Sequence, residues 1–129
     1  MLIIVACNNK KIIRENDYLL GKWHSSEGGD IYFNTNGTFI VKEISGSKFF
    51  SGFDQYHNTL IFGRGKWRII DRNGARSVIL GFENIDNLQA GISIQLELKR
   101  ANRIFTKKWK LFTWVGDPDD NITYEFEKK

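Results

Sequence analysis

Residues capable of acid–base or metal chemistry are few in this chain and stand far apart. His24 and His57 are the only histidines, and neither has a second histidine at the spacing of a metal site. The chain also has no Gly-x-Ser-x-Gly segment, which would expose a nucleophilic serine on a tight turn. We therefore expect a protein that is not an enzyme and that uses no cofactor.

An acidic cluster near the C-terminus is the remaining candidate for metal binding. It consists of Asp117, Asp119, Asp120 and Asn121. Their oxygen atoms suit Ca²⁺, but the spacing fits no EF-hand loop and lacks the bidentate glutamate that ends one. Asp and Asn are also favoured in turns, so we interpret the cluster as a turn and expect no metal site.

Cys7 is the only cysteine, so neither an internal disulfide nor a cysteine-based zinc site can form. It follows an apolar run, residues 2–6, and precedes a polar, basic segment, residues 8–11. Ile4-Val5-Ala6-Cys7 resembles the end of a bacterial lipoprotein signal peptide. The resemblance implies that Cys7 is acylated, for example with palmitate, and begins the mature protein. Alternatively, residues 2–6 form a buried first strand, as short apolar runs often do.

The lipoprotein resemblance divides the chain into a truncated signal segment with the lipidation cysteine (residues 1–7), a tether (residues 8–16) and one domain (residues 17–129). It implies a protein of the bacterial cell envelope, attached to a membrane through a lipid anchor. Asn8, in place of an aspartate after the cysteine, is similar to the signals that sort Gram-negative lipoproteins to the periplasmic face of the outer membrane. The net charge of +4 indicates only a modest attraction to anionic partners.

Alternation of apolar and polar residues dominates the domain, most clearly over residues 92–98 and 122–126, and predicts half-buried strands. Asn36-Gly37 and Asn73-Gly74 each stand between strand-like segments, a strong hairpin signal because both residues tolerate positive φ. A helical turn is expected over residues 14–20. Further strands are expected near residues 21–25, 59–62, 67–71, 77–81 and 108–115, with turns at residues 85–91 and 116–121. The pattern indicates an all-β fold, a single antiparallel β-barrel of about eight strands or else a sandwich.

A second resemblance begins at Gly21-Lys22-Trp23, after the helical turn. It is similar to the Gly-x-Trp that opens the first strand of lipocalins and of lipocalin-like domains in bacterial lipoproteins, and Gly65-Lys66-Trp67 is similar to a second such motif in them. The resemblance implies a lipocalin-like barrel over residues 17–129, in which Gly21 turns the chain tightly and the indole of Trp23 closes the floor. Arg100 and Arg103 are the candidates for the arginine that lipocalins lay across this tryptophan.

Four Trp, four Tyr and ten Phe are more aromatic residues than a minimal core of this size needs. Those in residues 48–56 show no alternation, which indicates either a loop over the barrel mouth or an irregular strand with a bulge. We expect Phe50, Phe53 and Tyr56 to be exposed there and to bind a ligand or partner, because binding residues gather on loops.

Two binding functions are compatible with these features. One is a carrier of an apolar small molecule inside the barrel, which requires a wide cavity lined by aromatic residues. The other is a periplasmic inhibitor or immunity lipoprotein that binds a protein toxin or cell-wall hydrolase, which a packed interior with exposed loop aromatics would favour. Basic residues beside Trp67 and Trp109 are similar to base-stacking surfaces, but export removes the protein from nucleic acid, so we expect no nucleic-acid partner.

Overall fold

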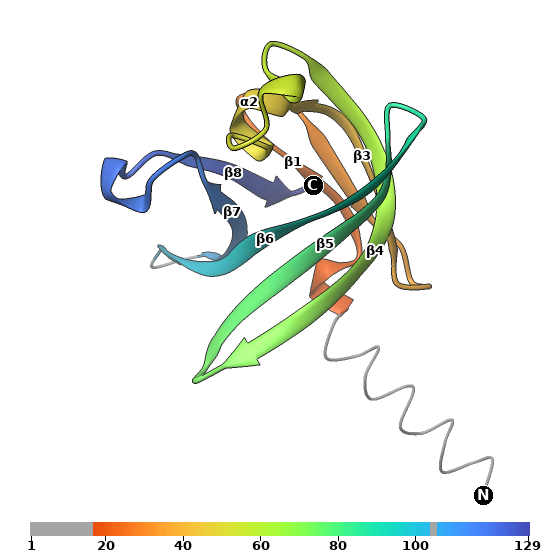
Figure 1. The fold of residues 1–129 in the computed structure, drawn as a ribbon. Helices are drawn as coiled ribbons and strands as arrows, with labels where there is room; N and C mark the ends of the chain where they lie inside the picture. The colour runs from red at the N-terminus through yellow and green to blue at the C-terminus, as the bar shows by residue number, and fades with distance from the viewer. Residues whose placement is uncertain (1–16, 104–105) are drawn as a thin grey trace, which may run out of the picture.

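A computed structural model describes residues 17–103 and 106–129, with side chains for residues 18–99 and 109–129 (Figure 1). The signal segment, Cys7 and the tether lie outside the described residues, as do the side chains of Arg100 and Arg103. Among the residues described, no helix is long and apolar enough to cross a membrane.

The described chain forms a closed barrel of eight antiparallel strands, in which each strand pairs with its neighbours in sequence and β1 pairs with β8. This confirms the predicted all-β antiparallel barrel with a short N-terminal helical turn. In chain order the elements are η1 (Asp17–Leu19), β1 (Gly21–His24), β2 (Asp30–Phe33), β3 (Thr38–Ser45), α2 (Gly46–Phe49), η2 (Asp54–Tyr56), β4 (Leu60–Arg72), β5 (Ala75–Ile85), β6 (Leu88–Arg103), β7 (Thr106–Trp114), η3 (Pro118–Asp120) and β8 (Thr123–Lys128).

Alternate side chains of the strands point into the barrel and form its core. On β5 the inward residues Val78, Leu80 and Phe82 are buried, and on β8 Tyr124 and Phe126 are buried. The residues between them point outward, because successive side chains of a strand face opposite sides. The predicted alternation along β8 is thus confirmed from Tyr124 onward, whereas Ile122 precedes the strand and is exposed.

The β4 strand is longer than the sequence predicts. Residues 59–62 and 67–71 were expected to be separate strands, but they belong to one continuous strand, Leu60–Arg72. The two glycines between them are not breaks, since they allow close contact across the sheet. A Cβ atom on Gly65 would lie 1.9 Å from the carbonyl oxygen of Gly81, and one on Gly63 would lie 2.8 Å from the ring of Phe82.

Turn chemistry fixes the hairpins. Asn73 and Gly74, with φ of 52° and 82°, form the predicted turn between β4 and β5, and residues 34–37 join β2 to β3 as predicted. Asp86 and Asn87, with φ of 51° and 67°, form a two-residue turn between β5 and β6, where the sequence predicts only a broader one. Positive φ at both central residues matches the twist of a hairpin.

The floor of the barrel lies at the end where the described chain begins (Figure 1). Trp23 is fully buried, and its indole nitrogen donates a hydrogen bond to the carbonyl oxygen of Leu19 at 2.8 Å. Gly21 has a φ of 109°, which an L side chain rarely adopts, so the chain can turn sharply from η1 into β1. Lys128 ties the other end of the chain to this floor by donating to the Tyr18 carbonyl at 2.8 Å.

Candidate functional site

The segment between β3 and β4 closes the opposite end of the barrel, where α2 lies (Figure 1). Phe49 and Phe50 are buried in the barrel interior, with exposed fractions of only 4% and 1%. The ring of Phe49 meets those of Tyr124 and Phe126 edge-on, at centroid distances of 5.9 and 6.0 Å, and Phe50 lies 5.2 Å from Phe82. These two rings are a plug made from the chain itself.

The structure separates the three aromatic residues predicted to bind a ligand or partner. The expectation that Phe50 is exposed is wrong, because its ring belongs to the plug. Phe53 is 41% exposed, as predicted for that residue. Tyr56 is half-buried, with its ring 4.9 Å from that of Phe50. The segment is a loop with two short helices over the barrel mouth, and the alternative of an irregular strand is wrong.

Polar contacts of Lys48 and Tyr124 connect the plug segment to the loop after β1 and to β8. Lys48 of α2 forms an ion pair with Glu27 in the loop after β1, and its ammonium lies 5.3 Å from the centroid of the Tyr124 ring. The Tyr124 hydroxyl donates to the carbonyl of Gly28 and accepts from the backbone N–H of Ser45 at 3.4 Å. Burial raises the pKa of Tyr124 above its ordinary value, because it disfavours the charged phenolate.

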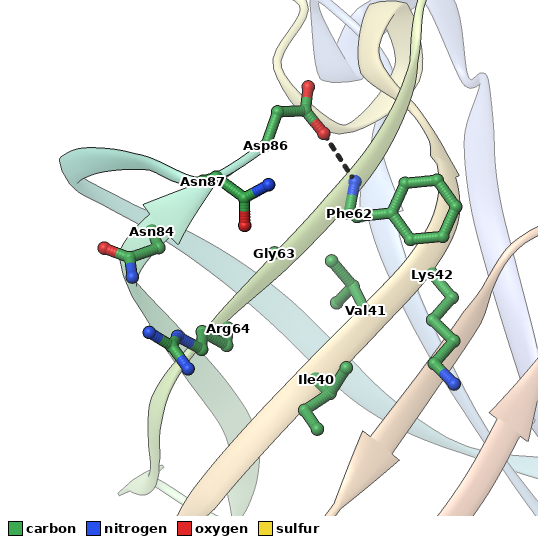
Figure 2. A pocket seen from close by; sticks show the side chains of 9 residues that line it. All are labelled: Ile40, Val41, Lys42, Phe62, Gly63, Arg64, Asn84, Asp86 and Asn87. Carbon is green, nitrogen blue, oxygen red and sulfur yellow. Dashed lines mark hydrogen bonds between the residues drawn. The ribbon is translucent and has the colours of Figure 1, made fainter.

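A surface hollow of about 410 Å³ lies on the outside of the barrel, across β4 (Figure 2). A second hollow of about 330 Å³ shares Ile40, Arg64 and Asn84 with the first. Together they form one groove, called here the β4 groove. Its lining comes from β3, from β4, from the end of β5 with the following turn, and from Asn34 before β3. The lining side chains include Ile40, Lys42, Phe62, Arg64, Glu83, Asn84, Asp86 and Asn87.

Two β-bulges flank the stretch of β4 that crosses this groove. In the β3–β4 pairing the register shifts between Val41 and Ile44, and in the β4–β5 pairing it shifts between Arg64 and Gly65, which lie opposite Asn84 and Phe82. Within the first bulge Glu43 has a φ of 55°, a conformation that is uncommon for residues other than glycine. Bulges redirect side chains and often stand next to functional sites, so their position supports the β4 groove as a site.

Two polar side chains of the β4 groove, Asp86 and Asn84, have hydrogen-bond partners within it. A carboxylate oxygen of Asp86 accepts a hydrogen bond from the backbone N–H of Phe62 at 3.0 Å (Figure 2). Turning the Asn84 amide over from the orientation drawn in Figure 2, so that its oxygen faces Arg64, lets it accept two hydrogen bonds from the guanidinium, at 3.0 and 3.2 Å. Ile40 and Phe62 add an apolar wall, being 41% and 50% exposed. Such a mixture of apolar, polar and charged groups can bind a partner or ligand.

The residues first considered for chemistry do not come together. His24 Nδ1 lies 2.6 Å from a carboxylate oxygen of Asp30, whereas His57 Nε2 lies 3.4 Å from the carbonyl of Ser51. Asp117 accepts a hydrogen bond from the backbone N–H of Asp119 at 3.0 Å, which confirms that the acidic cluster forms a turn. Within the described part of the chain, no group of three His, Cys, Asp or Glu side chains is arranged to hold a metal ion.

The β4 groove was not predicted from the sequence, although one signal for it exists. Along residues 60–68 the side chains that point outward are two apolar ones, Leu60 and Phe62, and then three cations, Arg64, Lys66 and Arg68.

Comparison of the chain with protein-family models, with curated proteins and with solved structures finds no match. A function for this chain therefore has to be argued from its own residues and geometry.

Proposed function

We propose that the protein is a non-catalytic binding domain that acts on a protein partner, as a periplasmic inhibitor or immunity lipoprotein does. The observation that carries this proposal is the plug: Phe49 and Phe50 occupy the mouth of the barrel against Phe82, Tyr124 and Phe126. A ligand could enter from this end only by expelling both rings. Each ring would then lose its favourable edge contacts and its burial.

Apolar side chains on the outer surface support a protein partner further. Phe53, Leu60, Phe62 and Leu88 are between 41% and 73% exposed, and all of them lie in or beside the segments that flank the plugged mouth. Large exposed apolar residues gathered on one region mark interaction surfaces, and aromatic residues contribute strongly to protein interfaces. The second candidate function is transport of an apolar small molecule. The many aromatic residues of the chain, four Trp, four Tyr and ten Phe, favour it.

The envelope location is part of the proposal and rests on the resemblance of Ile4-Val5-Ala6-Cys7 to a lipoprotein signal. In this view Cys7 carries the lipid, and residues 8–16 tether the barrel to the periplasmic face of the outer membrane. A polar, basic segment suits a flexible connection, since it has little apolar surface to bury. A soluble barrel held at a membrane is well placed to meet an incoming toxin or a cell-wall hydrolase.

Binding of an apolar probe separates the two functions. The full chain would be titrated with a fluorescent fatty acid, beside a Phe49→Ala, Phe50→Ala double variant whose interior lacks the plug. We expect no saturable uptake by the wild type, and uptake only when the plug is removed. Stoichiometric binding by the wild type would show that the plug opens on its own and would favour the carrier. If the double variant does not fold, the wild-type titration alone decides.

A further inference from the structure

We infer that the β4 groove is the docking site for an extended protein segment that presents a carboxylate next to an apolar side chain. This inference rests on the proposed function and names the kind of partner surface that the domain recognises. Arg64 is its central residue, because it lines both hollows of the groove. Figure 2 shows its guanidinium at one end of the first hollow and the ring of Phe62 on the opposite side of Gly63.

Several cations on the outer face of β3 and β4 have no carboxylate within 4 Å among the residues that the structure describes. Elsewhere Lys22, Lys48, Arg76 and Lys110 each lie within 4 Å of a carboxylate, whereas Arg72, Lys99, Lys128 and Lys129 form no ion pair with a described residue. On the β3–β4 face, Lys42, Arg64, Lys66 and Arg68 form no ion pair with any residue that the structure describes. Lys42 instead lies over the ring of Tyr32, 5.3 Å from its centroid.

Two carboxylates, Glu83 and Asp86, line the groove together with the cations Lys42 and Arg64, and neither carboxylate forms an ion pair with Arg64. Asp86 accepts a hydrogen bond from the backbone N–H of Phe62 and keeps its negative charge, and Glu83, on the β5 bulge, forms no ion pair with a described residue. With the Asn84 amide oxygen turned toward it, Arg64 donates to a neutral group, which positions the guanidinium without neutralising its charge. A guanidinium held in this way can bind a carboxylate through two parallel hydrogen bonds.

The shape of the groove favours a protein segment over a membrane surface. Its walls are the side chains of β3 on one side and the turn after β5 on the other (Figure 2). A flat bilayer cannot enter such a hollow, whereas a loop or terminus can. Ile40 stands opposite Arg64 in the β3–β4 register, so an apolar side chain of the partner would lie against Ile40 and Phe62 while its carboxylate meets Arg64. Aromatic residues and arginine are also the most frequent strong contributors to interfaces.

The test begins with a random twelve-residue peptide library displayed on phage, selected on the immobilised full chain. We expect the selected peptides to carry Asp or Glu beside an apolar residue. One selected peptide would be synthesised together with its Gln or Asn isostere, and both would be titrated by fluorescence anisotropy. The acidic peptide should bind at least tenfold more tightly than the isostere, and the preference should shrink as salt is raised.

Variants locate the binding in the groove. Arg64→Gln should weaken the acidic peptide at least tenfold, and Arg64→Lys should fall between it and the wild type, because lysine keeps the charge but not the paired hydrogen bonds. Arg72→Gln is the matched control, since Arg72 is exposed at the far end of the same strand, and it should change binding by less than about twofold. Unchanged thermal midpoints would show that all three variants are folded.

Several outcomes would overturn the inference. The inference would be wrong if no peptide is selected, if the selected peptides lack acidic residues, or if Arg64→Gln binds the acidic peptide as tightly as the wild type does.

Other outcomes would identify a different partner. Arg64-dependent binding to phosphatidylglycerol vesicles without peptide binding would assign the cations to a membrane instead. If a protein partner is captured equally by wild type and Arg64→Gln, but lost in Phe53→Ser, the groove is wrong and the proposed function stands. Saturable uptake of the fatty-acid probe by the wild type would count against the proposed function itself.

Discussion

The indole nitrogen of Trp23 lies 2.8 Å from the carbonyl oxygen of Leu19, to which it donates a hydrogen bond. Both side chains are fully buried, so this bond joins η1 to β1 at the centre of the floor. It satisfies the one polar atom of the indole and lets a large aromatic ring pack without an unpaired donor.

Trp23→Ala should therefore destabilise the protein by about 3–5 kcal/mol, the range found for large aromatic truncations in cores. Urea unfolding followed by circular dichroism measures this loss. Lys22→Ala is the control, because the Lys22 side chain is 41% exposed and should matter by less than about 1 kcal/mol. Equal and small losses at both positions would show that Gly21-Lys22-Trp23 does not build the floor.

The plug predicts opposite outcomes for two phenylalanines only three positions apart. Phe50→Ala should cost about 3–5 kcal/mol, because its ring is buried against Phe82 and Tyr56. Phe53→Ser should change the free energy of unfolding by less than about 1 kcal/mol, since Phe53 is 41% exposed. Thermal unfolding of the two variants side by side measures the contrast, and similar midpoints would contradict the plug.

Gly65 should not tolerate even a methyl group. A Cβ atom there would lie 1.9 Å from the Gly81 carbonyl oxygen, and because that atom belongs to the backbone of a paired strand, β4 and β5 would have to separate. We expect Gly65→Ala to lower stability by about 1–3 kcal/mol or more. Gly91→Ala is the matched control in β6, where no atom lies within 4 Å of the added Cβ. A calorimetric scan in which both variants melt alike would disprove the close contact.

Tyr124 should make the protein sensitive to alkali. Burial raises the pKa of Tyr124 above the ordinary value of 10.0, so above that pH the unfolded phenol loses its proton while the folded one retains it. The unfolded state then binds fewer protons, and stability falls as the pH rises toward the folded pKa; below the ordinary value this contribution is fully present. Tyr124→Phe should flatten the alkaline decline measured by urea unfolding at several pH values. Parallel declines in the two proteins would refute the assignment.

The lipid anchor has its own test. If Cys7 is acylated, the protein expressed from its full-length gene should partition with membranes into detergent, and Cys7→Ser should release it or leave an unprocessed precursor. Fractionation with mass spectrometry of the N-terminal peptide measures both. A wild-type protein that is soluble and carries an unmodified thiol would remove the envelope location from the proposal.

Much of the barrel could be predicted because its signals are local. The alternation along β8 and the Asn73-Gly74 turn depend on residues that are neighbours in sequence, and period-two alternation directly reports which side chains face a core. The unbroken course of β4 was missed because glycine disfavours strands locally. Gly65 is explained only by Gly81, and that pairing is visible only once the strands lie side by side.

The fate of the loop aromatics was not predictable for the same reason. Phe49, Phe50 and Phe53 are the same residue type within five positions of the chain, yet the first two fill the interior and the third is exposed to solvent. What separates them is contact with Phe82 and Tyr124, far away along the chain. The β4 groove likewise depends on bulges in two strands that pair with a third, and no local sequence pattern predicts both.

The meeting of β1 with β8 has a kinetic consequence. Every other strand pairing joins neighbours in the chain, whereas Trp23 and His24 must find Lys128 and Glu127 across almost the whole domain. Bringing residues so far apart in the chain together has an entropic cost, and only two residue pairs join β1 to β8. We therefore expect the seven pairings between neighbouring strands to form early and the β1–β8 pairing to form last. In the folded molecule the same junction would be the first to open, and amide hydrogen exchange along β1 would run ahead of that in the middle of β5.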